Sequence, residues 1–215
     1  MHSDFLLPQK DFSDWLRDIR KVSSNYAVHG TDNEITTVLW GAAEEFDEFT
    51  SLVDVDPKSK EFTEKLVEEY GDFVNYCMQG SYLLYRDSRE KLFRDESIGD
   101  RIDAIAMSFF AATNRVYLND YGDGFKKHYR AEARIAMAEF KGNCKRLYRG
   151  DAKDRDDGNR FWYHSQAQIS LLRAYETTCA IFSGYNIPLK TVAAFNVSKL
   201  NGRVERGTLT GHGRR

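Results

Sequence analysis

Apolar residues recur at helical spacing along almost the whole chain, and this pattern limits the possible folds more than any other feature. The alternation of polar and β-branched residues that is typical of strands is scarce. Each of the three prolines, Pro8, Pro57 and Pro188, precedes an amphipathic segment, as proline does when it opens a helix. Asn186 is a candidate cap for the helix that Pro188 opens. We therefore expect an all-α protein with helices over 8–27, 33–53, 57–86, 97–120, 124–149, 160–184 and 188–205.

The composition indicates the general class of protein, but the net charge does not favour any type of binding partner. A chain of 215 residues suits one domain, and 31 basic against 33 acidic residues leave a net charge of −2. No apolar run approaches the length of about 18 residues that a membrane span needs. Cys77, Cys144 and Cys179 lie too far apart for a zinc motif or a disulfide framework. We expect reduced thiols, a cytoplasmic location and no membrane partner.

The second predicted helix carries acids beside its apolar stripe. Phe46 and Phe49 belong to that stripe, and Glu45 lies on its flank with Glu48 one turn further along. Glu44 points nearly opposite the stripe. If one acidic pair faces a neighbouring helix, the pair is Glu45 and Glu48.

The third predicted helix repeats the arrangement. Glu69, Asp72 and Tyr76 line one edge of its apolar stripe. Gly71 costs this helix about 1 kcal/mol against alanine. That cost suggests that another segment approaches the backbone there, and the other acidic helix is the candidate.

Two acidic pairs on consecutive antiparallel helices raise a question of charge. Four facing carboxylates repel one another and cannot all ionise without a counter-charge, which a divalent cation supplies. Oxygen ligands favour Mg²⁺ or Mn²⁺ over zinc. The alternative is that both pairs are solvated helix faces. A ferritin-like di-iron site is excluded because no glutamate has a histidine three residues later.

The last predicted helix carries the complementary charge. Asn196, Lys199, Arg203 and Arg206 follow one edge of it, and a glycine-rich basic tail comes after them. Such a row suits the binding of a polyphosphate. A basic chain end without a role is the alternative.

Three segments together resemble one enzyme family. GAAEEFDEF, LVEEYGDFVNY and NVSKLNGRVERGTLTGHGRR resemble, in this order, the acidic and basic motifs of the all-α nucleoside triphosphate pyrophosphohydrolases, in particular their MazG-like branch. The resemblance covers about 8–85 and 160–207. It departs at the tail, where the family commonly has aspartate after G-x-G and this chain has Arg214.

The resemblance implies a fold, an activity and a set of residue roles. It implies a helical bundle of the all-α NTP pyrophosphatase type, which converts an NTP or dNTP to the monophosphate and pyrophosphate as a homodimer or tetramer. The substrate could also be another pyrophosphate ester, such as a phosphoribosyl nucleotide. The implied Mg²⁺ ligands are Glu45, Glu48, Glu69 and Asp72, with Mn²⁺ as a possible substitute. The implied catalytic residues are Glu48 as general base with Lys199 and Arg203, and the implied substrate-binding residues are Asn196, Tyr76 and Arg206.

The middle of the chain has no counterpart in compact members of that family. We expect 1–85 and 160–215 to form the catalytic core and 86–159 to be an inserted helical hairpin in the same compact unit. Helix 124–149 of this insertion mixes basic and aromatic residues. A non-catalytic protein that binds nucleic acid or a partner through this helix is the alternative function. Acids interleaved in the same helix make a solvated or oligomer-facing role the preferred expectation.

Overall fold

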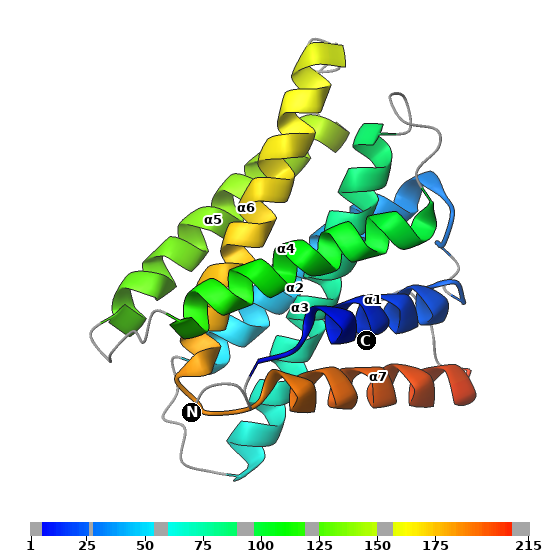
Figure 1. Cartoon of the computed structure of the whole chain (residues 1–215). Helices are drawn as coiled ribbons and strands as arrows, with labels where there is room; N and C mark the ends of the chain where they lie inside the picture. The colour runs from blue at the N-terminus through cyan, green and yellow to red at the C-terminus, as the bar shows by residue number, and fades with distance from the viewer. Residues whose placement is uncertain are drawn as a thin grey trace.

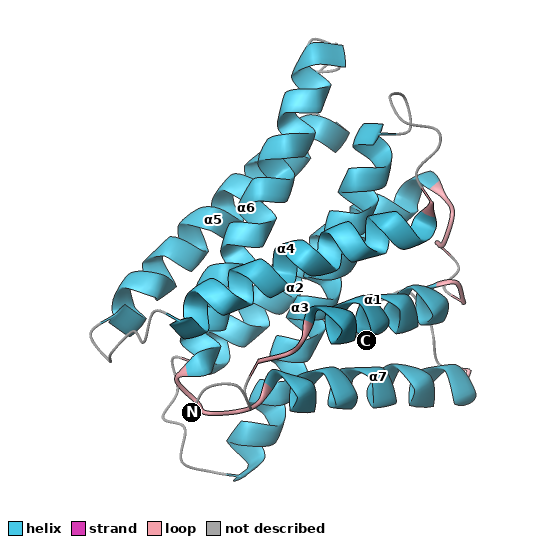
Figure 2. Cartoon of the chain, viewed as in Figure 1, coloured by secondary structure: helices cyan, strands magenta, loops and turns pink. Residues whose placement is uncertain are grey.

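The described part of the chain is entirely helical apart from short connections. The computed structural model describes residues 6–25, 28–53, 60–89, 97–118, 125–149 and 157–207. These residues form seven α-helices and no strand (Figures 1 and 2). The prediction of an all-α protein is confirmed. The helices are α1 (Gln9–Ser23), α2 (Asp32–Leu52), α3 (Lys60–Arg89), α4 (Ile98–Leu118), α5 (Phe125–Arg149), α6 (Asp157–Ser183) and α7 (Leu189–Glu205).

Helices α2 and α3 form an antiparallel pair that is joined by aromatic side chains. The ring centroids of Phe49 and Tyr70 lie 5.1 Å apart, and those of Phe46 and Phe73 lie 5.8 Å apart. The residue numbers rise along α3 as they fall along α2, which gives the antiparallel direction. Tyr70 also stacks on Phe182 of α6 at 4.1 Å, so this pair belongs to the central core.

Helix α7 packs on the α3 member of this pair. It packs against α3 and α1, and Figure 1 shows α1 lying between α7 and α4. A Cβ placed on Gly71 would lie 3.3 Å from Val192 of α7. The close approach that Gly71 suggested is therefore made by α7 and not by α2. Pro188 itself occupies the N-cap of α7 without a side-chain cap, so the prediction that Asn186 caps this helix is wrong.

The two helices of segment 86–159 pack against different partners. Helix α4 packs on α1, α3 and α6, whereas α5 lies along α6 and touches α2. In the described residues α4 and α5 make no contact with each other. They therefore do not pack as the two arms of a hairpin.

Several predicted features lie outside the described residues. These are the predicted start of the third helix at Pro57 and the tail from 208 to 215. Among the helices that the structure describes, none is long and apolar enough to cross a membrane.

Candidate metal centre

Glu45, Glu48 and Glu69 come together between α2 and α3. One carboxylate oxygen of each lies within 4.8 Å of the others. The aromatic contacts between the helices cause this arrangement, since Phe46 and Phe49 face Phe73 and Tyr70 and leave the adjacent acids on a shared edge. Glu48 is exposed, Glu45 is half-buried and Glu69 is only 2% exposed. This set of three carboxylates could hold a metal ion.

One oxygen of the buried glutamate lacks the partner that a carboxylate oxygen normally needs. Glu69 Oε1 is buried and has no hydrogen-bond partner in the described part of the chain. A buried, unpaired carboxylate oxygen is costly, and a cation is one of the few groups that offsets the cost. Burial and then the neighbouring Glu48 raise the pKa of Glu69. The environment therefore disfavours its negative charge unless positive charge is added.

Glu45 experiences the same electrostatic conflict. Burial, followed by the charges of Asp72, Glu48 and Glu69, raises its pKa to about 8. Like charges that are held together in a poorly solvated place cannot all ionise. The donor set is entirely oxygen, which fits Mg²⁺ or Mn²⁺. The residues that are present thus suit the ion that the sequence suggested.

Asp72, the fourth predicted ligand, is held by α7. Asn196 Nδ2 donates to Asp72 Oδ1 at 2.9 Å, and the Lys199 ammonium forms an ion pair with Asp72 Oδ2. Burial raises the pKa of Asp72, although Lys199 opposes this effect. Asp72 therefore lies beside the three-glutamate cluster with both carboxylate oxygens already bonded.

Asn196 links this carboxylate to a third helix. Its Oδ1 accepts a hydrogen bond from Trp15 Nε1 of α1 at 3.3 Å. Asn196 is 1% exposed and Trp15 is 2% exposed. Both the oxygen and the nitrogen of the Asn196 amide thus form hydrogen bonds inside the protein, and these bonds position Asp72.

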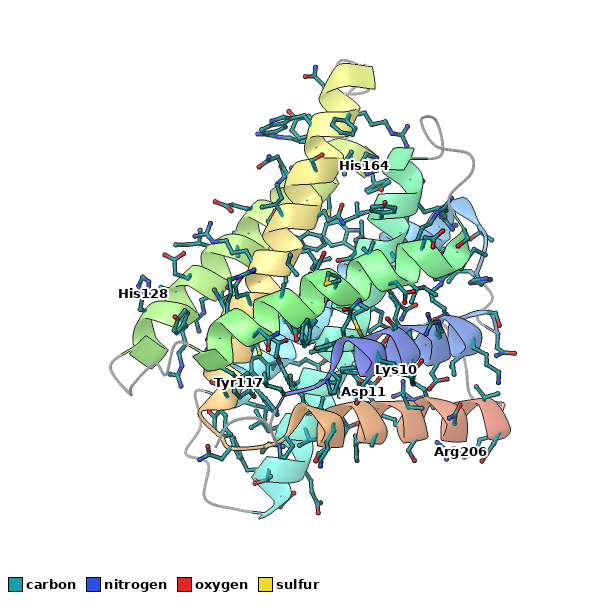
Figure 3. All side chains as sticks on the ribbon, in the orientation of Figure 1. Lys10, Asp11, Tyr117, His128, His164 and Arg206 are labelled. Atoms are coloured by element: carbon teal, nitrogen blue, oxygen red, sulfur yellow. The ribbon has the colours of Figure 1, made fainter. Side chains whose placement is uncertain are left out.

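Of the three basic residues that the sequence predicted for this site, two lie near the acids and one does not. Lys199 also pairs with Glu68 at 2.8 Å, and burial works against its charge while Asp72 and Glu68 raise its pKa. Arg203 is close enough for its charge to lower the pKa of Asp72. Arg206 lies at the far end of α7 (Figure 3). Its guanidinium lies over Gly202.

Tyr76 lies on the α2 side of the site. A Cβ added to Gly41 would come within 2.4 Å of the Tyr76 ring, so this ring covers the glycine backbone. The ring is half-buried. Tyr76 therefore helps to hold α2 against α3 next to Glu45.

A cavity of about 360 Å³ opens beside the cluster. It is lined by Asp47, Glu48, Ser51, Leu52, Lys65 and Glu69. Its size falls within the range of roughly 300–1,000 Å³ that small-molecule sites have. Two of the clustered glutamates thus face a space that a ligand can enter.

Sequence reasoning overlooked three residues of this region. Lys65 precedes Glu69 by four residues, and this spacing on one helix face could have revealed it. No local signal indicated that Glu68 would pair with Lys199 or that Trp15 would bond to Asn196. Those two contacts join helices that are far apart in the sequence.

Part of the basic surface of α5 is directed at α2. Lys141 pairs with Asp47 at 3.1 Å, and Arg130 donates to the Val53 carbonyl at 2.5 Å. The side chains of Lys126, Lys127 and Arg149 lie outside the described part. Two basic residues of this helix therefore serve packing against α2.

Comparison of this chain with protein-family models, with curated proteins and with solved structures found no match.

Proposed function

We propose that this protein is a Mg²⁺-dependent nucleotide pyrophosphohydrolase that converts an NTP or dNTP to the monophosphate and pyrophosphate. The observation that carries the proposal is the buried Glu69, whose Oε1 lacks a partner while Glu45 and Glu48 lie beside it. The order of acidic and basic motifs, which resembles the MazG-like enzymes, supplies the substrate class. The family membership and the NTP pyrophosphatase type of the bundle are part of this proposal.

The three glutamates would hold the ion, with Asp72 next to them. Mg²⁺, when bound, neutralises phosphate charge and acidifies a water molecule. Mn²⁺ is expected to substitute for it, because both ions prefer oxygen ligands.

The proposed roles of the remaining residues follow from their places. Glu48 is the exposed member of the cluster and is the group that would accept a proton from water. Lys199 forms ion pairs with both Asp72 and Glu68, and Arg203 adds positive charge on the same side. Asn196 and Tyr76 position the acidic helices. Arg206 would act only on a substrate that extends along α7. A homodimer or tetramer remains a prediction.

The proposal is tested by measuring pyrophosphate release from a panel of NTPs and dNTPs with Mg²⁺. We expect release from at least one nucleotide and its loss in Glu69→Gln, which removes the buried charge but keeps the shape. In a thermal-shift assay, Mg²⁺ should stabilise the unmodified protein and leave Glu69→Gln unchanged. Glu44→Gln is the matched control, because Glu44 lies on α2 next to Glu45 but is exposed and is not part of the three-glutamate cluster.

Two results would contradict the proposal. One is a folded protein that releases no pyrophosphate from any nucleotide in the presence of Mg²⁺. The other is salt-sensitive binding of DNA or RNA that survives Glu69→Gln and is lost when Lys126, Lys127 and Arg130 are neutralised. That second result would support the alternative of a nucleic-acid-binding protein.

A further inference from the structure

The cavity beside the glutamate cluster contains one basic residue. Lys65 lies one helical turn before Glu69 on α3, and both residues line the cavity together with Glu48 of α2. A ligand in this space would therefore contact a metal-binding edge and an ammonium group at the same time.

Lys65 differs from Lys199 in its exposure to solvent and in its ion pairs. The Lys199 side chain is 14% exposed and is paired with both Asp72 and Glu68. Lys65 is exposed, and within the described ranges its ammonium forms no ion pair. Of these two cations, only Lys65 can take an anionic partner without giving one up.

The charges decide which ligand fits. Asp47, Glu48 and Glu69 line the cavity with Lys65, and although Lys141 pairs with Asp47 the acids outnumber the lysine on the wall, so a free anion would be repelled from it. A divalent cation on the glutamates reverses this, and phosphate oxygens then bind between the cation and a lysine. The buried Glu69 Oε1 without a partner marks the side of the cavity where the cation would lie.

We propose that this cavity is the subsite for the pyrophosphate portion of the substrate, with Lys65 as its phosphate-binding residue. This inference rests on the proposed function, since the ion that makes the cavity attractive to phosphate is the same one. The proposal adds a phosphate-binding lysine on α3, whereas the sequence motifs predicted such basic residues only on α7. Lys199 and Lys65 then have separate tasks, one holding carboxylates and the other holding the ligand.

Calorimetric titration tests the subsite without relying on turnover. Inorganic pyrophosphate is titrated into the protein with saturating Mg²⁺, and Mg²⁺ is titrated alone. Lys65→Gln should weaken pyrophosphate binding about tenfold, as expected for the loss of one charge-assisted contact. The same substitution should leave Mg²⁺ affinity unchanged or slightly tighter, because a positive charge near the acids is removed. Lys65→Arg should restore most of the pyrophosphate affinity.

Lys145→Gln is the control, because Lys145 is an exposed lysine of α5 that does not line the cavity. Pyrophosphate affinity within twofold of the unmodified protein in Lys65→Gln would overturn the subsite, and so would an equal loss in Lys145→Gln. If the tenfold effect is present but no nucleotide is hydrolysed, the subsite stands and the hydrolase proposal fails. If nucleotides are hydrolysed and Lys65→Gln binds pyrophosphate normally, only the subsite fails.

Discussion

Asn196 shows how a single side chain can serve a site without facing the ligand. The resemblance assigned it to substrate binding, yet its amide bonds Trp15 on one side and Asp72 on the other. A buried amide with both ends used is fixed in orientation, and so is the carboxylate that it contacts. Residue type and spacing identified Asn196 as important. Its partners depend on where α1 lies, which no local pattern specifies.

Replacing Asn196 should cost stability even without a metal ion. Asn196→Ala leaves the Trp15 N–H unpaired in the core and removes one bond from Asp72, so we expect a loss of about 2–3 kcal/mol in the free energy of unfolding. Urea denaturation measures it. Asn201→Ala, at an exposed position on the same helix, should stay within about 0.5 kcal/mol. Equal effects of the two substitutions would contradict the positioning role of Asn196.

At the scale of elements, two glycines set how closely α3 is packed. Gly71 admits α7, and Gly41 of α2 admits the Tyr76 ring of α3. Helical periodicity predicted the bounds of most helices to within a few residues. It also predicted which face of α2 and α3 is buried, because the apolar stripes leave little choice. It could not tell which neighbour approaches Gly71, since α2 and α7 present similar apolar stripes.

Replacement by alanine should change the stability of the protein in opposite directions at Gly41, which is buried, and at Gly142, which is exposed. Gly41→Ala places a methyl group 2.4 Å from the Tyr76 ring, and we expect it to destabilise the protein by about 1–3 kcal/mol. Gly142→Ala meets nothing within 4 Å and should stabilise α5 by about 0.5–1 kcal/mol. Thermal unfolding of both variants checks this. A stabilising Gly41→Ala would show that Tyr76 does not pack on α2.

At the scale of the whole molecule, α3, α5 and α6 meet at a partly buried polar junction away from the glutamate cluster. His164 lies on α6 (Figure 3). It is 2% exposed, and its Nε2 lies 3.9 Å from Asp87 of α3. Tyr148 of α5 donates to Asp87 at 3.3 Å, and Arg160 lies 3.4 Å from it. Burial lowers the pKa of His164 to about 4, with Asp87 opposing the shift.

This junction makes global stability sensitive to acid. Between pH 6.5 and 4 the unfolded chain protonates His164 while the folded protein does not, so stability falls as the pH falls through this window. With a folded pKa of about 4 against the unperturbed 6.5, the loss from pH 7.5 to pH 5 is about 2 kcal/mol. Urea denaturation at both pH values should show this extra loss in the unmodified protein and not in His164→Gln. His128→Gln, which alters an exposed histidine of α5, should keep the full pH dependence.

The sequence by itself determined the all-α class, the order of the helices and the candidate edge that carries Glu45, Glu48 and Glu69. These features follow from local periodicity and from the short connection between two amphipathic helices. Only the tertiary structure decided that α5 pairs with α6 rather than with α4, that α7 binds Asp72 through Asn196 and Lys199, and that Lys65 faces a cavity. Several helices carry similar apolar faces, and the local sequence does not specify which of these faces pack together. That choice is made by the packing of the whole core, since each face alone would accept more than one partner.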